Sequence, residues 1–277
     1  MNIQQALQYG DQQLAATSPS ARRDAQVLLG HVLQCNSAYL FTWPEKKLTN
    51  EQLATYQSLI QQRQHGTPVA HLTGKREFWS LNLNVNNSTL IPRPETETLI
   101  EFILTKFNAK KNLKLIDMGT GTGAIAIALA TEKSQWNIFA CDISEQAIQL
   151  AALNSQQHQT DNIRFIQSDW FNNIADDDFD IIVSNPPYIA NDDVHLSQGD
   201  VRFEPKRALT AGDTGMDAIE YLCLHAKQHL RDDGYLIVEH GYDQQSAVND
   251  CFARNNYTEI EQQQDLSGHT RMTIGKI

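Results

Sequence analysis

Apolar residues up to about position 65 recur at spacings of three and four, which is the period of an amphipathic helix. Ser18-Pro19 is a helix start signal, because proline is well tolerated at the first helical position. Thr49 and Gln52 predict a capping box at the start of a further helix that ends near Gly66. We therefore expect residues 1–68 to form a small helical bundle. The apolar face of its Ser18-Pro19 helix would consist of Ala25, Leu28, Leu29, Val32 and Leu33.

The period changes to two between Val69 and Leu90. Apolar side chains there alternate with polar ones, and Asn86-Asn87-Ser88 supplies the residue types of a turn. This pattern predicts a β-hairpin that links two domains over residues 69–90. The next stretch, "IPRPETETLIEFIL", predicts a helix that opens after two prolines.

From Leu113 onward, apolar runs of strand length alternate with stretches of helical composition. The predicted strands are "LKLIDM", "WNIFACD", "IRFIQSD", "FDIIVSN", "GYLIVEHG" and "TRMTIGKI". Helices such as "AIAIALATE" and "SEQAIQLAALNSQQ" fall between them. This alternation predicts an α/β domain over residues 91–277, with a mostly parallel sheet and helices on both faces. Ligands of such sheets gather at the carboxyl ends of the strands.

Composition and charge narrow the class of protein further. With 41% hydrophobic and 20% charged residues, the chain has the balance of an ordinary globular protein. Its formal net charge of −11 argues against a large contact with phosphates, so we expect no direct nucleic acid binding. We expect no membrane association, because no apolar stretch reaches the length of a membrane span and the N-terminus lacks the layout of a secretory signal. The four cysteines form no CxxC pair, which predicts reduced thiols in the cytoplasm and no metal site.

Three successive strands of the predicted sheet end in residues that suit a nucleoside. The first runs into Asp117-Met118-Gly119-Thr120-Gly121-Thr122-Gly123, whose glycines let the backbone turn sharply and approach a ligand. The second ends at Asp142, which can accept hydrogen bonds from both ribose hydroxyls. The third ends at Asp169-Trp170, a carboxylate and a flat ring for the base. Together these stretches predict one site for a nucleoside-containing cofactor.

Two kinds of cofactor fit this pattern. Gly119, Gly121 and Ala124 also satisfy the dinucleotide pattern G-x-G-x-x-A, so a nicotinamide-dependent dehydrogenase is the rival interpretation. Asp117 favours S-adenosylmethionine, because its carboxylate would repel a pyrophosphate and could bind a cationic amino-acid group. A dehydrogenase would also need an acid or base for hydride transfer, and the motif that ends the fourth strand supplies nothing evident for that role.

That motif is Asn185-Pro186-Pro187-Tyr188. The prolines stiffen the backbone, so the groups beside them are held in place before a substrate arrives. The Asn185 side-chain oxygen and the Pro186 carbonyl can each accept one N–H of a planar NH₂ group, which turns the nitrogen lone pair toward a methyl donor. Tyr188 can pack its ring on that group. The motif predicts methyl transfer to an amide or exocyclic amine, with Asn185, Pro186 and Tyr188 as catalytic residues and no general base.

With these features together, the chain resembles class I S-adenosylmethionine-dependent methyltransferases that act on planar nitrogens. Three further stretches make it similar to the HemK/PrmC family over essentially its whole length. They are "HLTGKREFW" (His71 to Trp79), "LIPRPETE" (Leu90 to Glu97) and "RFEPKRALTAGDTGMDAI" (Arg202 to Ile219). Enzymes of that family are protein-(glutamine-N5) methyltransferases of class I peptide chain release factors. The resemblance implies a Rossmann-like sheet whose last strand is antiparallel.

The resemblance also implies roles for individual residues. The methyl donor would lie against Gly119 to Gly123, with Asp142 on its ribose and Asp169 and Trp170 at its adenine. Asn185 would lie close to the donor methyl. The acceptor glutamine, in the Gly-Gly-Gln loop of a release factor, would enter between Asn185 and Tyr188, beside the two prolines.

Other residues are weaker candidates. Arg93, Glu95, Glu204 and Arg207 would shape the acceptor side, although a structural salt bridge explains each of them at least as well. For Glu239 and His240 a core role is the better interpretation. The helical bundle would contact the release factor, and we expect a monomer. The same site could act on other acceptors. The alternatives are a glutamine of a ribosomal protein and, in nucleic acid, the N6 of adenine or the N2 of guanine.

Overall fold

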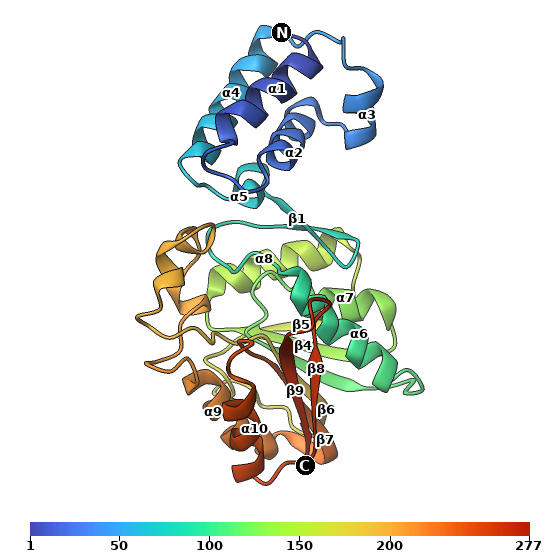
Figure 1. Cartoon of the computed structure of the whole chain (residues 1–277). Helices are drawn as coiled ribbons and strands as arrows, with labels where there is room; N and C mark the ends of the chain where they lie inside the picture. Colours follow the sequence, from blue (N-terminus) through green and yellow to red (C-terminus); the bar gives the residue numbers. More distant parts are fainter. The chain divides into compact units, whose positions relative to one another are not determined.

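The computed structural model describes residues 1–277 and divides into two compact units (Figure 1). The helical unit contains Met1–Lys75 together with His195–Phe203. The second unit, here called the sheet unit, contains Arg76–Val194 and Glu204–Ile277. The helical unit is therefore discontinuous in sequence, which the sequence patterns did not predict.

Amphipathic helices form the helical unit, as predicted. They are α1 (Ile3–Leu14), α2 (Ala21–Leu33), α3 (Ser37–Thr42), α4 (Asn50–Gln64) and α5 (Val69–Thr73). The predicted capping box of Thr49 and Gln52 is present at α4. Helix α2 begins two residues later than the Ser18-Pro19 signal, because both Ser18 and Ser20 direct their hydroxyls to Asp24 and Ser20 takes the N-cap position. The core between the helices consists of Ile3, Ala6, Leu14, Ala21, Ala25, Leu28, Leu29, Leu40, Tyr56 and Ile60.

A short hairpin follows the helices. Its strands are β1 (Lys75–Phe78) and β2 (Leu81–Asn84), and the turn residues Trp79 and Ser80 both have positive φ, at 50° and 59°. Two positive φ values match the twist of a two-residue hairpin turn. The prediction of period-two structure from Val69 onward was wrong for Val69–Thr73, which forms α5 after Pro68 and ends at Gly74 in the left-handed region.

Seven strands form the sheet of the sheet unit in the order β5-β4-β3-β6-β7-β9-β8. The strands are β3 (Lys114–Met118), β4 (Asn137–Asp142), β5 (Ile163–Gln167), β6 (Phe179–Ser184), β7 (Leu230–Glu239), β8 (Thr258–Gln264) and β9 (Thr270–Lys276). Strands β3 to β7 pair in parallel, and β9 pairs antiparallel with both β7 and β8. The mostly parallel sheet with an antiparallel last strand is thus confirmed.

Helices cover both faces of this sheet (Figure 1). Buried side chains of α6 (Glu97–Lys106) and α7 (Ala124–Glu132) share one apolar cluster with Leu115, Ile138 and Ile181. Helix α8 (Glu145–Gln157) contacts α7, β4 and β5. On the other face, α9 (Asp217–His225) and α10 (Gln245–Arg254) pack against Ile116 and Ile182. Short 3₁₀ turns occupy Pro94–Thr96, Val194–Ser197, Val201–Phe203, Lys206–Ala208 and Ala226–Gln228.

The strand order reverses beside β3. The chain runs from β3 outward to β4 and β5, then crosses back to place β6 on the other side of β3. The loops after β3 and β6 therefore diverge to opposite faces, which leaves a crevice at the carboxyl ends of these strands. No helix of the chain is both long enough and apolar enough to span a membrane.

A substitution in the central strand β6 tests how tightly the core around the sheet is packed. Ile182 is fully buried and pairs with Ile116 of β3 and Leu236 of β7. We expect Ile182→Ala to lower the free energy of unfolding by about 3 kcal/mol, because the cavity cannot close between two paired strands. Urea denaturation of the full chain measures the change. Leu266→Ala, at a fully exposed position, is the control and should leave the midpoint unchanged. An equal effect of both substitutions would contradict this packing.

Candidate active site

The turn after β3 is shaped for close approach by a ligand. Gly119, Gly121 and Gly123 have φ of 74°, 56° and 83°, a region that favours glycine. The amides of Gly119 and Thr120 donate to the Cys141 carbonyl of β4 at 2.9 and 2.8 Å, which fixes the turn. A Cβ on Gly119 would meet no atom within 4 Å, whereas one on Gly123 would lie 2.8 Å from the Ile127 side chain. The first position thus opens to space and the third packs against helix α7.

Asp117 lies beneath this turn and is fully buried. Its Oδ2 accepts a hydrogen bond from the Thr120 hydroxyl at 2.6 Å, and its Oδ1 has no partner. Burial raises the pKa of Asp117 to about 7, while the hydrogen bond from Thr120 acts in the other direction. Asp117 therefore supports the turn from below and does not line the cavity described next.

A cavity of about 630 Å³ lies above the turn, within the size range of small-molecule sites. Gly119 to Thr122, Asp142, Asp169, Trp170, Asn185 and Pro187 line it, as do Arg93 and Arg207. The structure thus brings together most of the residues that the sequence singled out. Gly123, Pro186, Tyr188 and Glu95 are not among the lining residues.

Asp142 is held at the tip of β4. Its Oδ2 accepts from the Gly121 amide at 3.0 Å, and its Oδ1 accepts from the Ser144 amide at 2.9 Å. Burial raises the pKa of Asp142, while these two amides and the charge of Arg207 act in the other direction. Arg207 also donates to the Ser144 hydroxyl at 2.7 Å. Each carboxylate oxygen keeps a second lone pair for a ligand hydroxyl.

One apolar side chain of the cavity was missed from the sequence. Ile143 follows Asp142 directly, is 55% exposed and lines the cavity along with Trp170. An exposed isoleucine after a strand-end acid offers an apolar surface for a base. Its position next to Asp142 was the available signal. Trp170 has a φ of 47°, and its ring lies 5.8 Å from that of Tyr221.

The Asn185-Pro186-Pro187-Tyr188 motif is held at both ends by hydrogen bonds. The Asn185 amide nitrogen donates to the Thr96 hydroxyl at 3.0 Å, which leaves the side-chain oxygen to accept from a ligand. The Tyr188 hydroxyl donates to Glu239 at 3.4 Å. Burial raises the pKa of Glu239 to about 7, and hydrogen bonds with Thr96 and Tyr188 oppose this shift. Thr96, whose role the sequence did not reveal, therefore connects Asn185 to the carboxylate that holds Tyr188.

The remaining candidates have structural partners. Arg93 pairs with Glu204 at 2.6 Å, and Glu204 also accepts from the Ile91 amide at 3.1 Å. His240 is fully buried between the Gly241 carbonyl and the Thr273 hydroxyl, both at 2.9 Å. Burial lowers the pKa of His240, so the neutral ring is favoured. No group of three or more His, Cys, Asp or Glu side chains is arranged to hold a metal ion.

Comparisons with known proteins identify the family of the chain. The family model of the PrmC N-terminal domain matches residues 5–74, and that of the methyltransferase small domain matches residues 96–203. The release factor glutamine methyltransferase of Shewanella oneidensis is 47% identical over 99% of this chain and 96% of its own length. The Escherichia coli protein of that name is 44% identical, over 100% of this chain and 99% of its own.

The chain belongs to the release factor glutamine methyltransferase family. The resemblance drawn from the sequence motifs is thus confirmed. Among solved structures, a methyltransferase from Pyrococcus furiosus matches 80% of this chain and 98% of its own, with a TM-score of 0.54 at 16% identity. A ribosomal protein L11 methylase from Lactobacillus delbrueckii matches 68% and 80%, with a TM-score of 0.51 at 20% identity. At such identities these two structures support the fold alone.

The buried carboxyl of Asp117 predicts how the stability of this protein depends on pH. Its pKa is about 7 in the folded chain against an ordinary 3.8, so folding favours the protonated form. Asp117 therefore contributes most to the free energy of unfolding at pH values below its ordinary pKa, and this contribution is lost as the pH rises through 7. We expect Asp117→Asn to lose less stability than the wild type between pH 5 and pH 8, measured by urea denaturation. Asp161→Asn, an exposed control, should follow the wild type. Identical pH profiles for all three proteins would exclude this role of Asp117.

Proposed function

We propose that the cavity holds S-adenosylmethionine and that Asn185 presents to it the side-chain amide of a glutamine in a class I release factor. Family membership carries the activity itself: methyl transfer from S-adenosylmethionine to the N5 atom of a release factor glutamine. The single observation that carries the assignment of the site is the opening of Asn185 into the same cavity as the glycine turn and Asp142.

The residues present fit the cofactor. Gly119 offers unfilled space where a Cβ would stand, Asp142 offers two carboxylate oxygens for ribose hydroxyls, and Ile143 and Trp170 offer apolar surface for adenine. We assign Thr120, Thr122 and Asp169 to the same site, and Asp117 and Gly123 to its support. When bound, the cofactor supplies an electrophilic methyl group on a sulfonium.

The amide nitrogen of a glutamine is a poor nucleophile, and residues of this chain compensate for that. The lone pair of an amide nitrogen is delocalised, so the nitrogen attacks poorly. Two acceptors that hold its hydrogens orient the lone pair toward the methyl donor and stabilise the positive charge that develops on the nitrogen. We assign these acceptors to the Asn185 side-chain oxygen and the Pro186 carbonyl. Pro187 stiffens the backbone between them and Tyr188. After transfer the nitrogen is acidic enough to lose a proton to water, so no general base is required.

Hydrogen bonding keeps Asn185 ready for this role. With Thr96 accepting from the amide nitrogen, rotation of the side chain by half a turn would lose a hydrogen bond and face two donors toward the incoming NH₂ group. Glu239 steadies the same arrangement through Thr96 and Tyr188. Preorganised acceptors of this kind need no rearrangement when the substrate arrives.

We propose that the helical segment of residues 1–68 contacts the release factor outside its Gly-Gly-Gln loop. The stretch that contains α5 and the β1–β2 hairpin links this segment to the proposed methyltransferase domain of residues 91–277. Arg93 and Glu95 would shape the entrance for that loop. The formal net charge of −11 supports a protein acceptor over a nucleic acid. We expect the enzyme to act as a monomer in the cytoplasm.

Labelled S-adenosylmethionine tests this assignment of substrate. We expect label in a class I release factor and none in a variant whose Gly-Gly-Gln glutamine is replaced by alanine. Ribosomes and transfer RNA, incubated in parallel, should stay unlabelled. Label in RNA or in a ribosomal protein, with none in the release factor, would overturn the proposal.

Two substitutions separate catalysis from cofactor binding. Asn185→Ala should lower kcat by roughly 100-fold, the usual effect of removing one preorganised polar contact from the reacting group, with little change in the Kd of S-adenosylmethionine. Asp142→Ala should raise that Kd by roughly 10-fold or more, because hydrogen bonds to a charged group are lost. Calorimetric titration and single-turnover kinetics measure the two effects. If Asn185→Ala weakened cofactor binding more than Asp142→Ala did, the two roles would be exchanged.

A further inference from the structure

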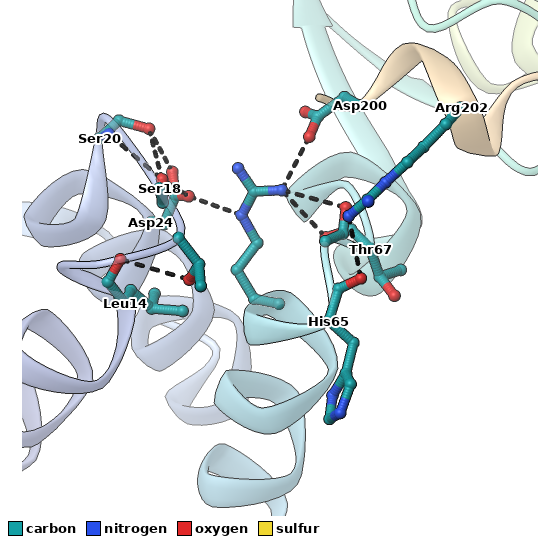
Figure 2. Close-up of polar contacts among 11 residues, drawn as sticks. Leu14, Ser18, Ser20, Asp24, His65, Thr67, Asp200 and Arg202 are labelled. Atoms are coloured by element: carbon teal, nitrogen blue, oxygen red, sulfur yellow. Dashed lines mark hydrogen bonds and ion pairs between the residues drawn. The ribbon is translucent and has the colours of Figure 1, made fainter. Parts of the chain in front are cut away.

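The stretch His195–Phe203, here called the inserted segment, belongs to the helical unit although the sheet unit precedes and follows it in sequence. The chain leaves the sheet unit after Val194, six residues past Tyr188, and returns at Glu204. Two arginines join the inserted segment to the end of α4 (Figure 2). Arg63 of α4 donates to Asp200 of the segment, and Arg202 of the segment donates to the His65 carbonyl at the end of α4.

Arg63 is the first of these arginines, and Asp24 fixes its orientation. The Arg63 side chain is only 9% exposed, and its Nε donates to Asp24 at 2.7 Å. The same carboxylate accepts from the hydroxyls of Ser18 and Ser20, each at 2.8 Å. Figure 2 shows Asp24 grouped with these two serines, across from Asp200. The Asp24 carboxylate is thereby fully engaged and holds one edge of the guanidinium in place.

The other edge of the Arg63 guanidinium faces the inserted segment. Its Nη1 donates to Asp200 at 2.8 Å and lies 3.4 and 3.3 Å from the carbonyl oxygens of Gly66 and Thr67. Burial alone would lower the pKa of Arg63, but the hydrogen bonds to Asp200 and Asp24 outweigh burial and raise it. Asp24 already pairs with the buried charge, so the ion pair that joins α4 to α2 does not involve Asp200.

Arg202 reaches in the opposite direction. Its guanidinium donates to the His65 carbonyl at 3.1 Å, at the end of α4 where unpaired carbonyls attract cations. Gly66, with a φ of 96°, leaves the room that this contact needs, because a Cβ there would overlap the Arg202 guanidinium. Two charge-assisted contacts of opposite direction therefore hold the inserted segment on the helical unit.

Both ends of the inserted segment continue into the wall of the cavity. Before it, Ile189 exchanges backbone hydrogen bonds with Leu209 and Ala211, at 2.9 and 3.0 Å. After it, Glu204 pairs with Arg93, and Arg207 lines the cavity beside Asp142. Since Glu204 follows the inserted segment directly, we expect a change in the position of the segment to reach the cavity wall through Glu204 and its partner Arg93.

We propose that Arg63 is a positioning residue for methyl transfer: through Asp200 it fixes the inserted segment, and with it the cavity wall at which the protein acceptor enters. This inference rests on the proposed function, because it takes the release factor as the acceptor. Arg63 touches neither cofactor nor substrate in this scheme.

Asp200→Asn is the sharpest variant to test the positioning role. It removes the charge that Arg63 holds, while Asp24 still compensates the guanidinium. Arg63→Ala would leave Asp24 buried without its cation and would destabilise the helical unit. The matched control is Asp192→Asn, which removes the same charge at an exposed position of the same loop.

Hydrogen exchange of the full-length protein measures directly whether Asp200 holds the inserted segment on the helical unit. We expect amides in residues 195–203 to exchange roughly fivefold faster in Asp200→Asn, the equivalent of one partly buried ion pair, with α2 and α4 unchanged. Asp192→Asn should exchange like the wild type. Unchanged exchange of residues 195–203 in Asp200→Asn would overturn the inference, as would equal acceleration in the control.

Steady-state kinetics with full-length release factor measure whether the position of the inserted segment affects binding of the protein acceptor. Asp200→Asn should raise the KM for the factor roughly fivefold while the Kd of S-adenosylmethionine stays at its wild-type value. Faster exchange combined with a wild-type KM would refute the positioning role. If the wild type methylated no release factor, the proposed function would fail, and the exchange experiment would still decide whether Asp200 tethers the segment.

Discussion

The pairing of β3 with β6 is the constraint on which the rest of the site depends. Met118 and Ser184 are register partners at the carboxyl ends of these strands, and the Ser184 hydroxyl donates to the Met118 carbonyl at 2.6 Å in the fully buried interior. The next residues along the two strands are Gly119 and Asn185. Backbone register therefore brings the glycine turn and the Asn185 amide to the same edge of the sheet, although they are far apart in sequence. A slip of this register would separate them.

Two buried carboxyls support the two halves of that edge. Asp117 lies below the glycine turn and Glu239 lies behind Tyr188, both almost without solvent contact and both with a pKa near 7. Each is bonded to a hydroxyl that belongs to the site, Thr120 in one case and Tyr188 in the other. Burying an acid costs free energy, and here each buried carboxyl supplies a hydrogen-bond acceptor to a loop, which no apolar residue could do.

Much of this arrangement was predictable from the sequence because it follows from local pattern. Apolar runs marked every parallel strand, and residues just after the runs of β3, β4, β5 and β6 marked the cavity. Strand β8, "TEIEQQQ", was missed because an edge strand with partly exposed side chains carries no apolar run. Helix α5 was missed because five residues are too few to display a helical period.

Thr96 and Asp200 were out of reach for a different reason. Their roles come from partners 89 and 137 positions away, and no spacing within the sequence encodes such contacts. Ile143 was missed for another reason: its position after Asp142 was visible in the sequence, but its 55% exposure was not.

The discontinuity of the helical unit has a consequence for how such enzymes can be recombined. A chimera that exchanges only the first 75 residues between two relatives would join a foreign Arg63 and Gly66 to a resident Asp200 and Arg202. The two segments form one module, although the gene separates them by more than a hundred codons. They must be inherited, or transplanted, together.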